Sequence, residues 1–242
     1  MDEFADGNAI LRYLQAKEKE NPSIVNFAEN YPVTCAEKIG GSVLIKGSSD
    51  HDWVYIYGGS EEELESIDCM LGADDRYFAA IESWMIPFLS DGKRVKWVLS
   101  AMRLILPEDV VLPEPAHEIS ELTPGDAAFV YENSGYKEYL SVEYVHERIK
   151  NGMNSCIREA GRPVGWAITQ DDGAIGFLHV LPECRRKGYA RDVTVDLINK
   201  ARAKGKIPFA HIEEDNSRSM NLATGLGFKE DRIVNWFELY YG

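Results

Sequence analysis

Three consecutive basic side chains stand directly before a glycine in LPECRRKGYAR, residues 181–191. The basic residues are Arg185, Arg186 and Lys187, and they follow a predicted strand. Gly188 lacks a Cβ atom, so the backbone of this turn can approach a ligand closely. A predicted helix begins after the glycine, and a helix N-terminus presents unpaired N–H groups with a partial positive charge. The combination predicts a seat for a pyrophosphate group.

A second interpretation of the same segment stays open at this point. Charge and spacing alone also fit an ordinary helix start with solvated basic side chains. Other phosphate-binding patterns are missing, because no GxGxxG follows a strand and no GxxxxGK[ST] occurs. Dinucleotide-binding and nucleoside triphosphate-binding folds are therefore disfavoured.

The basic turn contrasts with the charge of the whole chain. The 242 residues contain 26 basic and 40 acidic side chains, for a net charge of −14. The first 115 residues hold 10 basic and 21 acidic side chains, and the remainder hold 16 and 19. So acidic a chain argues against a nucleic-acid partner, and the uneven charge indicates two regions.

The ends and the cysteines add expectations about location and metals. The start MDEFADGNAI lacks the basic residues and apolar run of a signal peptide, and no apolar stretch reaches about 18 residues. We therefore expect a cytoplasmic protein with no membrane partner. The cysteines show no CxxC pair and no histidine at ligand spacing, so we expect reduced thiols and no metal site; they are Cys35, Cys69, Cys156 and Cys184.

The first region alternates helical and strand patterns. Ser60 with Glu63 three residues later is a capping-box pattern and predicts a helix start. The expected elements are two short helices over 8–32 broken at Pro22, a hairpin over 42–59, helices over 60–71 and 74–89, and a strand over 94–106.

Three prolines within residues 107–115 predict a linker, because proline disfavours helix and removes sheet hydrogen bonds. We place the boundary near residue 113, which divides the chain into domains 1–112 and 113–242. The expected elements of the second domain are a strand, turn and helix over 119–135, a helix over 141–152, an antiparallel meander over 153–182, a helix ending at Gly205, a strand over 207–214, a helix over 217–226 and a final strand pair over 228–241.

The segment HVLPECRRKGYAR resembles the acyl-CoA binding motif of the GNAT superfamily of N-acyltransferases. That motif is arginine or glutamine, two residues, glycine, one residue, and glycine or alanine. Here Arg185, Gly188 and Ala190 fill the three positions. A later segment, HIEEDNSRSMNLATGLGF, resembles the GNAT segment in which an asparagine, here Asn216, opens a helix that ends in a Leu-Gly-Phe turn.

The resemblance to the superfamily covers roughly residues 117–242. Two segments, PVGWAITQDDGAIGFLHVLPE and PFAHIEEDNSRSM, are similar more specifically to the glycine N-acyltransferase branch. It implies an α/β (α+β) fold of GNAT type, with a mixed, mostly antiparallel sheet flanked by helices. Members of that branch carry a second, degenerate GNAT-like domain before the catalytic one. The same is expected of residues 1–112, although the family motifs are absent there.

The resemblance also implies how acyl-CoA is held. Backbone groups around Val180 would pair with the pantetheine arm, and the N–H groups from Arg186 to Arg191 would hold the pyrophosphate. Asn216 would lie by the pantetheine and would also serve as an ordinary N-cap. The implied cofactor-binding residues are Val180, Arg185, Arg186, Lys187, Gly188, Tyr189, Ala190, Arg191, Asn216 and Ser219.

Two positions depart from the family pattern. Ala223 stands where many members have a tyrosine acid, and Ala174 stands where a glutamate base is expected. A thiol with a pKa near 8.5 leaves as a thiolate without prior protonation, so the missing acid is tolerable. The missing base therefore matters more than the missing acid. A site without a base favours α-amino groups, with a pKa near 8, over lysine-like amines, with a pKa of about 10.4.

Substitute bases are His179 on the strand that enters the motif, and His211 and Glu213 on the next strand. Alternation along a strand places His211 and Glu213 on one face, where they would cooperate. The alternative for His211 is a buried structural histidine that is bonded to a backbone carbonyl.

We therefore expect a transferase that uses acetyl-CoA or another acyl-CoA as co-substrate and needs no metal. It would transfer the acyl group to a small amine, such as an α-amino acid, by direct attack on the thioester. The alternative is a non-catalytic acyl-CoA-binding or sensor module with a GNAT fold, which Ala174 and Ala223 favour.

Overall fold

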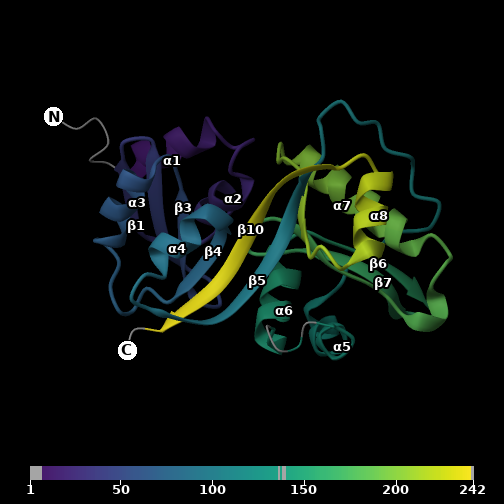
Figure 1. Ribbon diagram of the computed structural model, residues 1–242. Helices are drawn as coiled ribbons and strands as arrows, with labels where there is room; N and C mark the ends of the chain where they lie inside the picture. The colour runs from purple at the N-terminus through teal and green to yellow at the C-terminus, as the bar shows by residue number, and fades with distance from the viewer. Residues whose placement is uncertain (1–6, 136, 138–139, 241–242) are drawn as a thin grey trace. The chain divides into compact units, whose positions relative to one another are not determined.

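Figure 1 shows the computed structural model, which describes residues 7–135, 137 and 140–240. These residues form two compact units. Unit 1 comprises the described parts of Met1–Arg103, Ile212–Asp215 and Glu230–Gly242, and unit 2 comprises those of Leu104–His211 and Asn216–Lys229. The division into domains 1–112 and 113–242 stays a prediction. Among the described residues, no helix is long and apolar enough to cross a membrane.

Unit 1 contains a mixed sheet. The β1–β2, β2–β3 and β4–β10 pairs run antiparallel, whereas β3 and β4 run parallel. In sheet order the strands are β1 (Val33–Ile39), β2 (Ser42–Ser48), β3 (Asp52–Tyr57), β4 (Tyr77–Glu82), β10 (Lys229–Tyr240) and β5 (Arg94–Ile105).

The alternation of side chains along β2 explains how helices cover both faces of this sheet. Val43 and Ile45 belong to the apolar cluster formed with the first two helices, and Leu44 belongs to the cluster formed with the later ones. The expected hairpin and early helices are confirmed. The helices are α1 (Gly7–Gln15), α2 (Pro22–Asn30), α3 (Glu61–Asp68), the 3-10 turn η1 (Ser83–Met85) and α4 (Ile86–Leu89).

The expected helix over 74–89 is wrong for its first half, which forms strand β4. Apolar residues spaced three or four apart fit either structure over so short a stretch. Pairing decides the outcome here, because β4 bonds to β3 on one side and to β10 on the other. Only the end of the stretch is helical, with Pro87 in the first turn of α4.

The expected strand pair over 228–241 is also wrong, because β10 is one continuous strand. Tyr241 lies outside the described residues. No glycine or proline interrupts the segment after Phe228, and its most turn-like residue, Asn235, is committed to the sheet. The buried side chain of Asn235 donates to the carbonyl of Ile81 on β4 at 2.9 Å.

Unit 2 is built around a three-stranded antiparallel meander, β6-β7-β8, as expected. Helix α7 packs against all three strands, and α5 and α6 pack against each other. Strand β9 follows β5 in strand order, and Leu106 N donates to Pro208 O at 2.9 Å. The elements are η2 (Pro124–Asp126), α5 (Ala127–Glu132), α6 (Val142–Asn151), β6 (Asn154–Glu159), β7 (Arg162–Thr169), β8 (Ile175–Val180), η4 (Pro182–Cys184), α7 (Tyr189–Ala203), β9 (Phe209–Ile212) and α8 (Ser217–Gly225).

The mixed, mostly antiparallel strands flanked by helices confirm the expected fold class. Within unit 2, the sequence expectations for α6, α7 and α8 hold to within a few residues. The strand, the turn and the helix that were expected over 119–135 appear as an isolated bridge at Ser120, η2 and α5.

Candidate functional site

Strand β8 is a bulged edge strand. Ala167 of β7 faces two residues of β8, Phe177 and Leu178, where the register shifts. Phe177 has a φ of 47°, in the left-handed region that L-residues rarely adopt. A bulge of this kind bends the strand and re-aims its side chains. Because β8 ends the order β6-β7-β8, no described strand pairs with its other edge within this sheet.

The backbone of Val180 faces that open edge. Leu181 N donates to Val164 O of β7 at 2.9 Å, so in an antiparallel ladder the residue before it points its own N–H and C=O the other way. Arg185 Nε reaches the Val180 carbonyl at 3.1 Å. The edge therefore carries a backbone donor at Val180, next to a carbonyl that a basic side chain already holds.

The turn between β8 and α7 has two left-handed residues. Arg186 has a φ of 64° and Gly188 a φ of 90°. Gly188 is the N-cap of α7, a helix of 15 residues, and it provides no side-chain cap. The N–H groups of residues 189–191 in the first helical turn thus have no partner within the helix. Such a series of inward-facing N–H groups is a concave site for an anion.

The basic side chains of the turn differ in how much of their charge is available. Lys187 Nζ lies 2.9 Å from Glu159 Oε1, and Tyr189 Oη donates to the same oxygen at 2.6 Å. The hydrogen bonds from Tyr189 and then from Lys187 lower the pKa of Glu159. Arg186 is exposed, and no side chain in the described part of the protein bonds to it. Arg186 therefore offers the least compensated charge of the turn.

A buried carboxylate in α7 fixes the chain beside this turn. Asp192 is fully buried, and its Oδ2 accepts from the N–H groups of Ala116 (2.8 Å) and His117 (3.1 Å). Burial raises the pKa of Asp192, but hydrogen bonds from His117 and Arg191 lower the pKa by more than burial raises it. The net pKa of Asp192 therefore lies below its usual value. Asp192 therefore stays ionised at neutral pH and anchors residues 116–117.

The His117 ring lies at the start of α7. Its Nδ1 is 2.6 Å from Asp192 Oδ2, and the ring meets Tyr189 edge-on with centroids 4.7 Å apart. A Cβ atom built on Gly188 would lie 3.7 Å from His117 Cε1, an ordinary contact. The space at Gly188 is therefore bordered by His117 without being filled by it.

The second resemblance segment forms α8. Asn216 is its N-cap, and the side-chain oxygen of Asn216 accepts from Ser219 N at 3.2 Å, which confirms the expected cap. Ala223 is 6% exposed on this helix. The roles of Asn216 and Ser219 towards a ligand stay predictions.

His179 lies beside the bulge of β8. Its ring stacks on Trp166 of β7, with centroids 4.9 Å apart. Burial, and then the positive charge of Arg185, lower the pKa of His179 and keep the imidazole neutral at pH 7. Its Nε2 atom is buried and has no hydrogen-bond partner among the residues that the structure describes. A buried polar atom in this state requires a partner, which a ligand can supply.

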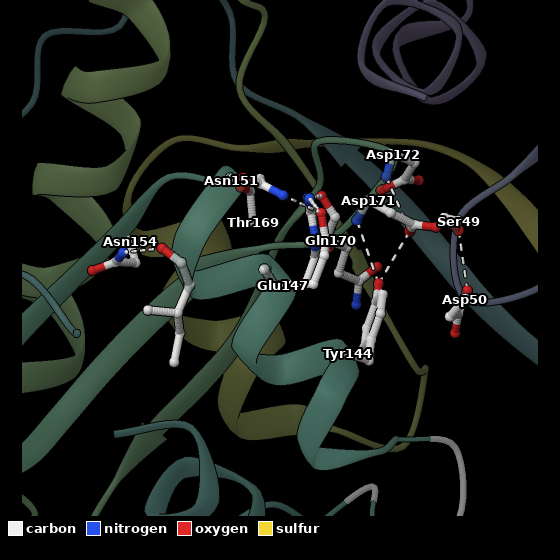
Figure 2. Close-up of polar contacts among 12 residues, drawn as sticks. Ser49, Asp50, Tyr144, Glu147, Asn151, Asn154, Thr169, Gln170, Asp171 and Asp172 are labelled. Carbon is white, nitrogen blue, oxygen red and sulfur yellow. Dashed lines mark hydrogen bonds and ion pairs between the residues drawn. The ribbon is translucent and has the colours of Figure 1, made fainter. Parts of the chain in front are cut away.

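The other candidate histidine, His211, lies on β9 beside an aspartate. The Nδ1 atom of His211 is 3.6 Å from Asp172 Oδ2, and both side chains are almost fully buried. Asp172 belongs to the tight turn between β7 and β8, and Figure 2 shows it next to Asp171, which contacts Tyr144 of α6. The other carboxylate oxygen, Oδ1, accepts from Ala174 N at 3.0 Å.

Glu213 lies outside this arrangement. Strand β9 ends at Ile212, so the alternation argument that paired Glu213 with His211 does not extend to it. Ala174 is fully buried at the start of β8 and offers no ionisable group. The proposed roles of His179, His211 and Glu213 as bases stay predictions.

Comparison with known proteins identifies the architecture. Residues 153–237 match the family model described as FR47-like protein. A putative acetyltransferase of the GNAT family from Novosphingobium aromaticivorans superposes with a TM-score of 0.57 at 17% identity, covering 86% of this chain and 91% of its own. The chain has the GNAT acetyltransferase fold. A GCN5-related N-acetyltransferase-like protein from Streptococcus suis matches with a TM-score of 0.57 at 14% identity, covering 97% and 100%.

A Drosophila protein of known crystal structure has the same fold over almost the whole chain. Its TM-score is 0.72 at 18% identity, covering 97% of this chain and 90% of its own. The family-model match runs from just before β6 into β10 and includes the bulged strand and the α7 turn. The matched segment contains every residue of the site described above except Tyr144 and residues 116–117.

Four site residues were missed at the sequence level: Glu159, Asp172, Asp192 and His117. Asp172 lies in the turn between β7 and β8, within the stretch predicted as a meander, but turn residues are usually solvated and its burial had no sequence signal. Asp192 carried one usable signal, because an acidic residue in the first helical turn is favoured by the helix dipole.

Proposed function

We propose that this protein is an acyl-CoA-dependent N-acyltransferase that uses acetyl-CoA and acts on a small amine. The observation that carries the proposal is the start of α7, a long helix without a side-chain cap that follows two left-handed residues. A phosphate group satisfies the first-turn N–H groups and interacts favourably with the helix dipole.

The remaining residues fit the rest of an acyl-CoA molecule. The open edge of β8 around Val180 suits a pantetheine amide that adds to the sheet, and Arg186 adds a charge for a phosphate. His179 Nε2 is a buried atom that a polar group of the arm would satisfy. Acetyl-CoA supplies an acyl group activated as a thioester.

The chemistry that we propose is direct attack of a neutral amine on the thioester carbon. A new C–N bond forms, the C–S bond breaks, the CoA sulfur leaves as a thiolate, and the attacking nitrogen releases its extra proton to solvent. The Val180 N–H at the open edge is the donor for the negative charge that develops on the carbonyl oxygen. Free thiols have a pKa near 8.5, so the leaving group needs no acid at the position of Ala223.

We infer α-amino groups as the acceptor class, in line with the resemblance to the glycine N-acyltransferase branch. An α-amino group has a pKa near 8 and is about a tenth neutral at pH 7, whereas a lysine-like amine is neutral less than about once in a thousand. The buried alanines at 174 and 223 provide no compensating proton-transfer group. Unit 1 as a second, degenerate GNAT-like domain stays a prediction.

A second candidate function is a non-catalytic acyl-CoA-binding module. The same two alanines favour this function, because they stand where relatives have proton-transferring residues. The α7 turn is present all the same. Both functions require CoA binding, and they differ only in turnover.

The test is release of CoA from acetyl-CoA in the presence of an amine panel at several pH values. The panel holds glycine, other α-amino acids and polyamines, with the matching N-acetyl amino acids as controls that lack a free amine. Because Cys69 is exposed and would react with thiol reagents, CoA is quantified by chromatography. Amine-dependent release supports the transferase, and tight binding without release across the panel supports the binding module. Absence of any acetyl-CoA binding overturns both functions.

A further inference from the structure

The imidazole of His117 is bonded at one nitrogen and available at the other. Its Nδ1 lies 2.6 Å from Oδ2 of Asp192, and within the described ranges no residue bonds to Nε2. The lowered pKa of Asp192 keeps its carboxylate ionised, so Nδ1 carries the hydrogen that joins the two atoms. The His117 side chain is 35% exposed. Its Nε2 atom is therefore a polar group that a ligand can engage.

Asp192 holds the ring from a fixed position on α7. Its Oδ2 also accepts from the backbone N–H groups of Ala116 and His117, at 2.8 and 3.1 Å. Its Oδ1 is bonded by Nε and Nη2 of Arg191, at 3.0 and 2.9 Å. The carboxylate thus has donors at both oxygens, as a fully buried ionised group requires. The orientation of the imidazole is set by these contacts before any ligand arrives.

The ring of His117 lies against the turn that precedes α7. A Cβ atom built on Gly188 would lie 3.7 Å from Cε1 of the ring, and Tyr189 meets the ring edge-on with centroids 4.7 Å apart. Because Cε1 is bonded to both ring nitrogens, Nε2 is one bond away from the atom that borders Gly188. The available nitrogen therefore lies beside the start of the helix proposed to bind the pyrophosphate.

Most basic side chains near this turn are already engaged within the protein. Arg185 bonds a backbone carbonyl, Lys187 is paired with a glutamate, and Arg191 is paired with Asp192. Only Arg186 among these four is exposed without a side-chain partner in the described part of the chain. A pyrophosphate carries a negative charge on each phosphate group. One further positive charge at the turn would complete the compensation.

We propose that His117, as an imidazolium held by Asp192, is a further ligand of the acyl-CoA pyrophosphate, an inference that rests on the proposed function. In the protonated ring both nitrogens carry a hydrogen, and Nε2 donates its hydrogen to a phosphate oxygen. The carboxylate at Nδ1 and the phosphate at Nε2 then stabilise the same cation from opposite sides. His117 lies outside the segment that the family model matches, so the motif residues alone do not form the whole seat.

The proposal makes acyl-CoA binding depend on pH, because imidazole changes its charge between about pH 5 and 8. The phosphates of the ligand also titrate, so the comparison is made between wild type and variant with the same ligand. The charged and titratable side chains around the ring come from α7, the preceding turn, β6 and the neighbouring residue. They are Asp192, Arg191 and Tyr189, Arg186 and Lys187, Glu159, and Glu118.

The experiment measures acetyl-CoA affinity by calorimetric titration at about pH 6 and about pH 8.5. His117→Asn keeps an amide N–H in place of Nδ1 for Asp192 and removes Nε2, whereas His117→Ala removes both groups. We expect His117→Asn to bind about five- to tenfold more weakly at the lower pH and within about twofold of wild type at the higher pH. His117→Ala should lose at least as much affinity, and the exposed control His146→Ala should bind as wild type.

Two further ligands identify the group that His117 contacts. Acetyl-dephospho-CoA lacks the 3′-phosphate but keeps the pyrophosphate, so the ratio between wild type and His117→Asn should persist. S-Acetylpantetheine has no phosphate, so the ratio should disappear. In the wild type, the NMR signals of the His117 imidazole should shift on addition of acetyl-CoA or acetyl-dephospho-CoA and stay unchanged with S-acetylpantetheine.

Each contrary result has a distinct meaning. Equal affinity of wild type and His117→Asn at the lower pH would show that the ring only anchors its own segment. A loss of equal size at both pH values would exclude the imidazolium, and a loss absent with acetyl-dephospho-CoA would move the contact to the 3′-phosphate. Each of these results overturns the inference and leaves the transferase intact. A wild type that binds no acetyl-CoA overturns the proposed function itself.

Discussion

Replacement of Gly188 by alanine tests the α7 turn with a perturbation whose size can be worked out. Gly188 has a φ of 90°, and an added Cβ would meet only His117 Cε1, at 3.7 Å, so no steric clash is introduced. The cost is the left-handed backbone alone, about 1 to 2 kcal/mol for an L-residue. If the first helical turn rotates to relieve this strain, one charge-assisted hydrogen bond to a phosphate is lost, about 1.5 to 3 kcal/mol, or tenfold or more in affinity.

The chain offers a matched control at the other end of the same helix. Gly205 has a φ of 70°, and nothing lies within 4 Å of its added Cβ, so Gly205→Ala carries a similar backbone cost away from the proposed seat. Both variants should lower the Tm by about 2 to 4 °C per kcal/mol of lost stability. Calorimetric titration with acetyl-CoA then measures affinity, and only Gly188→Ala should lose it.

The two variants separate stability from binding. Equal acetyl-CoA affinity in wild type and Gly188→Ala, with both glycine variants destabilised alike, would show that the start of α7 is not the pyrophosphate seat. Equal loss of affinity in both variants would show that helix stability controls binding, and not the geometry of the turn.

Three further predictions follow from single side chains. Arg186→Ala should weaken acetyl-CoA binding about three- to tenfold, and the loss should shrink as salt is added; a titration at two salt concentrations checks this, and a salt-independent loss contradicts it. Because the folded pKa of Asp192 is lowered, its stabilisation is present above the unfolded pKa of about 4 and is lost as the pH falls through the folded value. Asp192→Asn should therefore cost about 1 to 3 kcal/mol in urea unfolding at pH 7 and less near about pH 3, and an equal cost at both would refute the assignment. Burial raises the pKa of Cys156 to about 11, so iodoacetamide should label exposed Cys69 in the folded protein and Cys156 only after unfolding, as read by mass spectrometry; early labelling of Cys156 would contradict its burial.

The elements that local chemistry determines were predictable from the sequence. Helix α7 could be placed because apolar residues line one face and a glycine stands at each end, at Gly188 and Gly205. The meander could be placed because turn residues separate three runs of strand-forming residues. In both cases the deciding interactions are close in the sequence.

The remaining features depend on residues that are distant in the sequence. Strand β4 exists because β3 and β10 flank it, and β10 begins almost 150 residues later. The neighbours of Asp172 and His211 are likewise set by tertiary packing, and a carboxylate in a tight turn is solvated in most proteins. The types of these residues can be read from the sequence, but their burial and mutual distance cannot.

The left-handed residues at the start of α7 have a consequence for the thermodynamics of binding. Arg186 and Gly188 hold strained or entropically costly conformations before any ligand arrives. That cost is met once, when the chain folds, and it does not recur at each binding event. A ligand that meets such a turn loses its own freedom but orders little of the protein. The turn is therefore preorganised for binding, and we expect fast association with little conformational change in the protein.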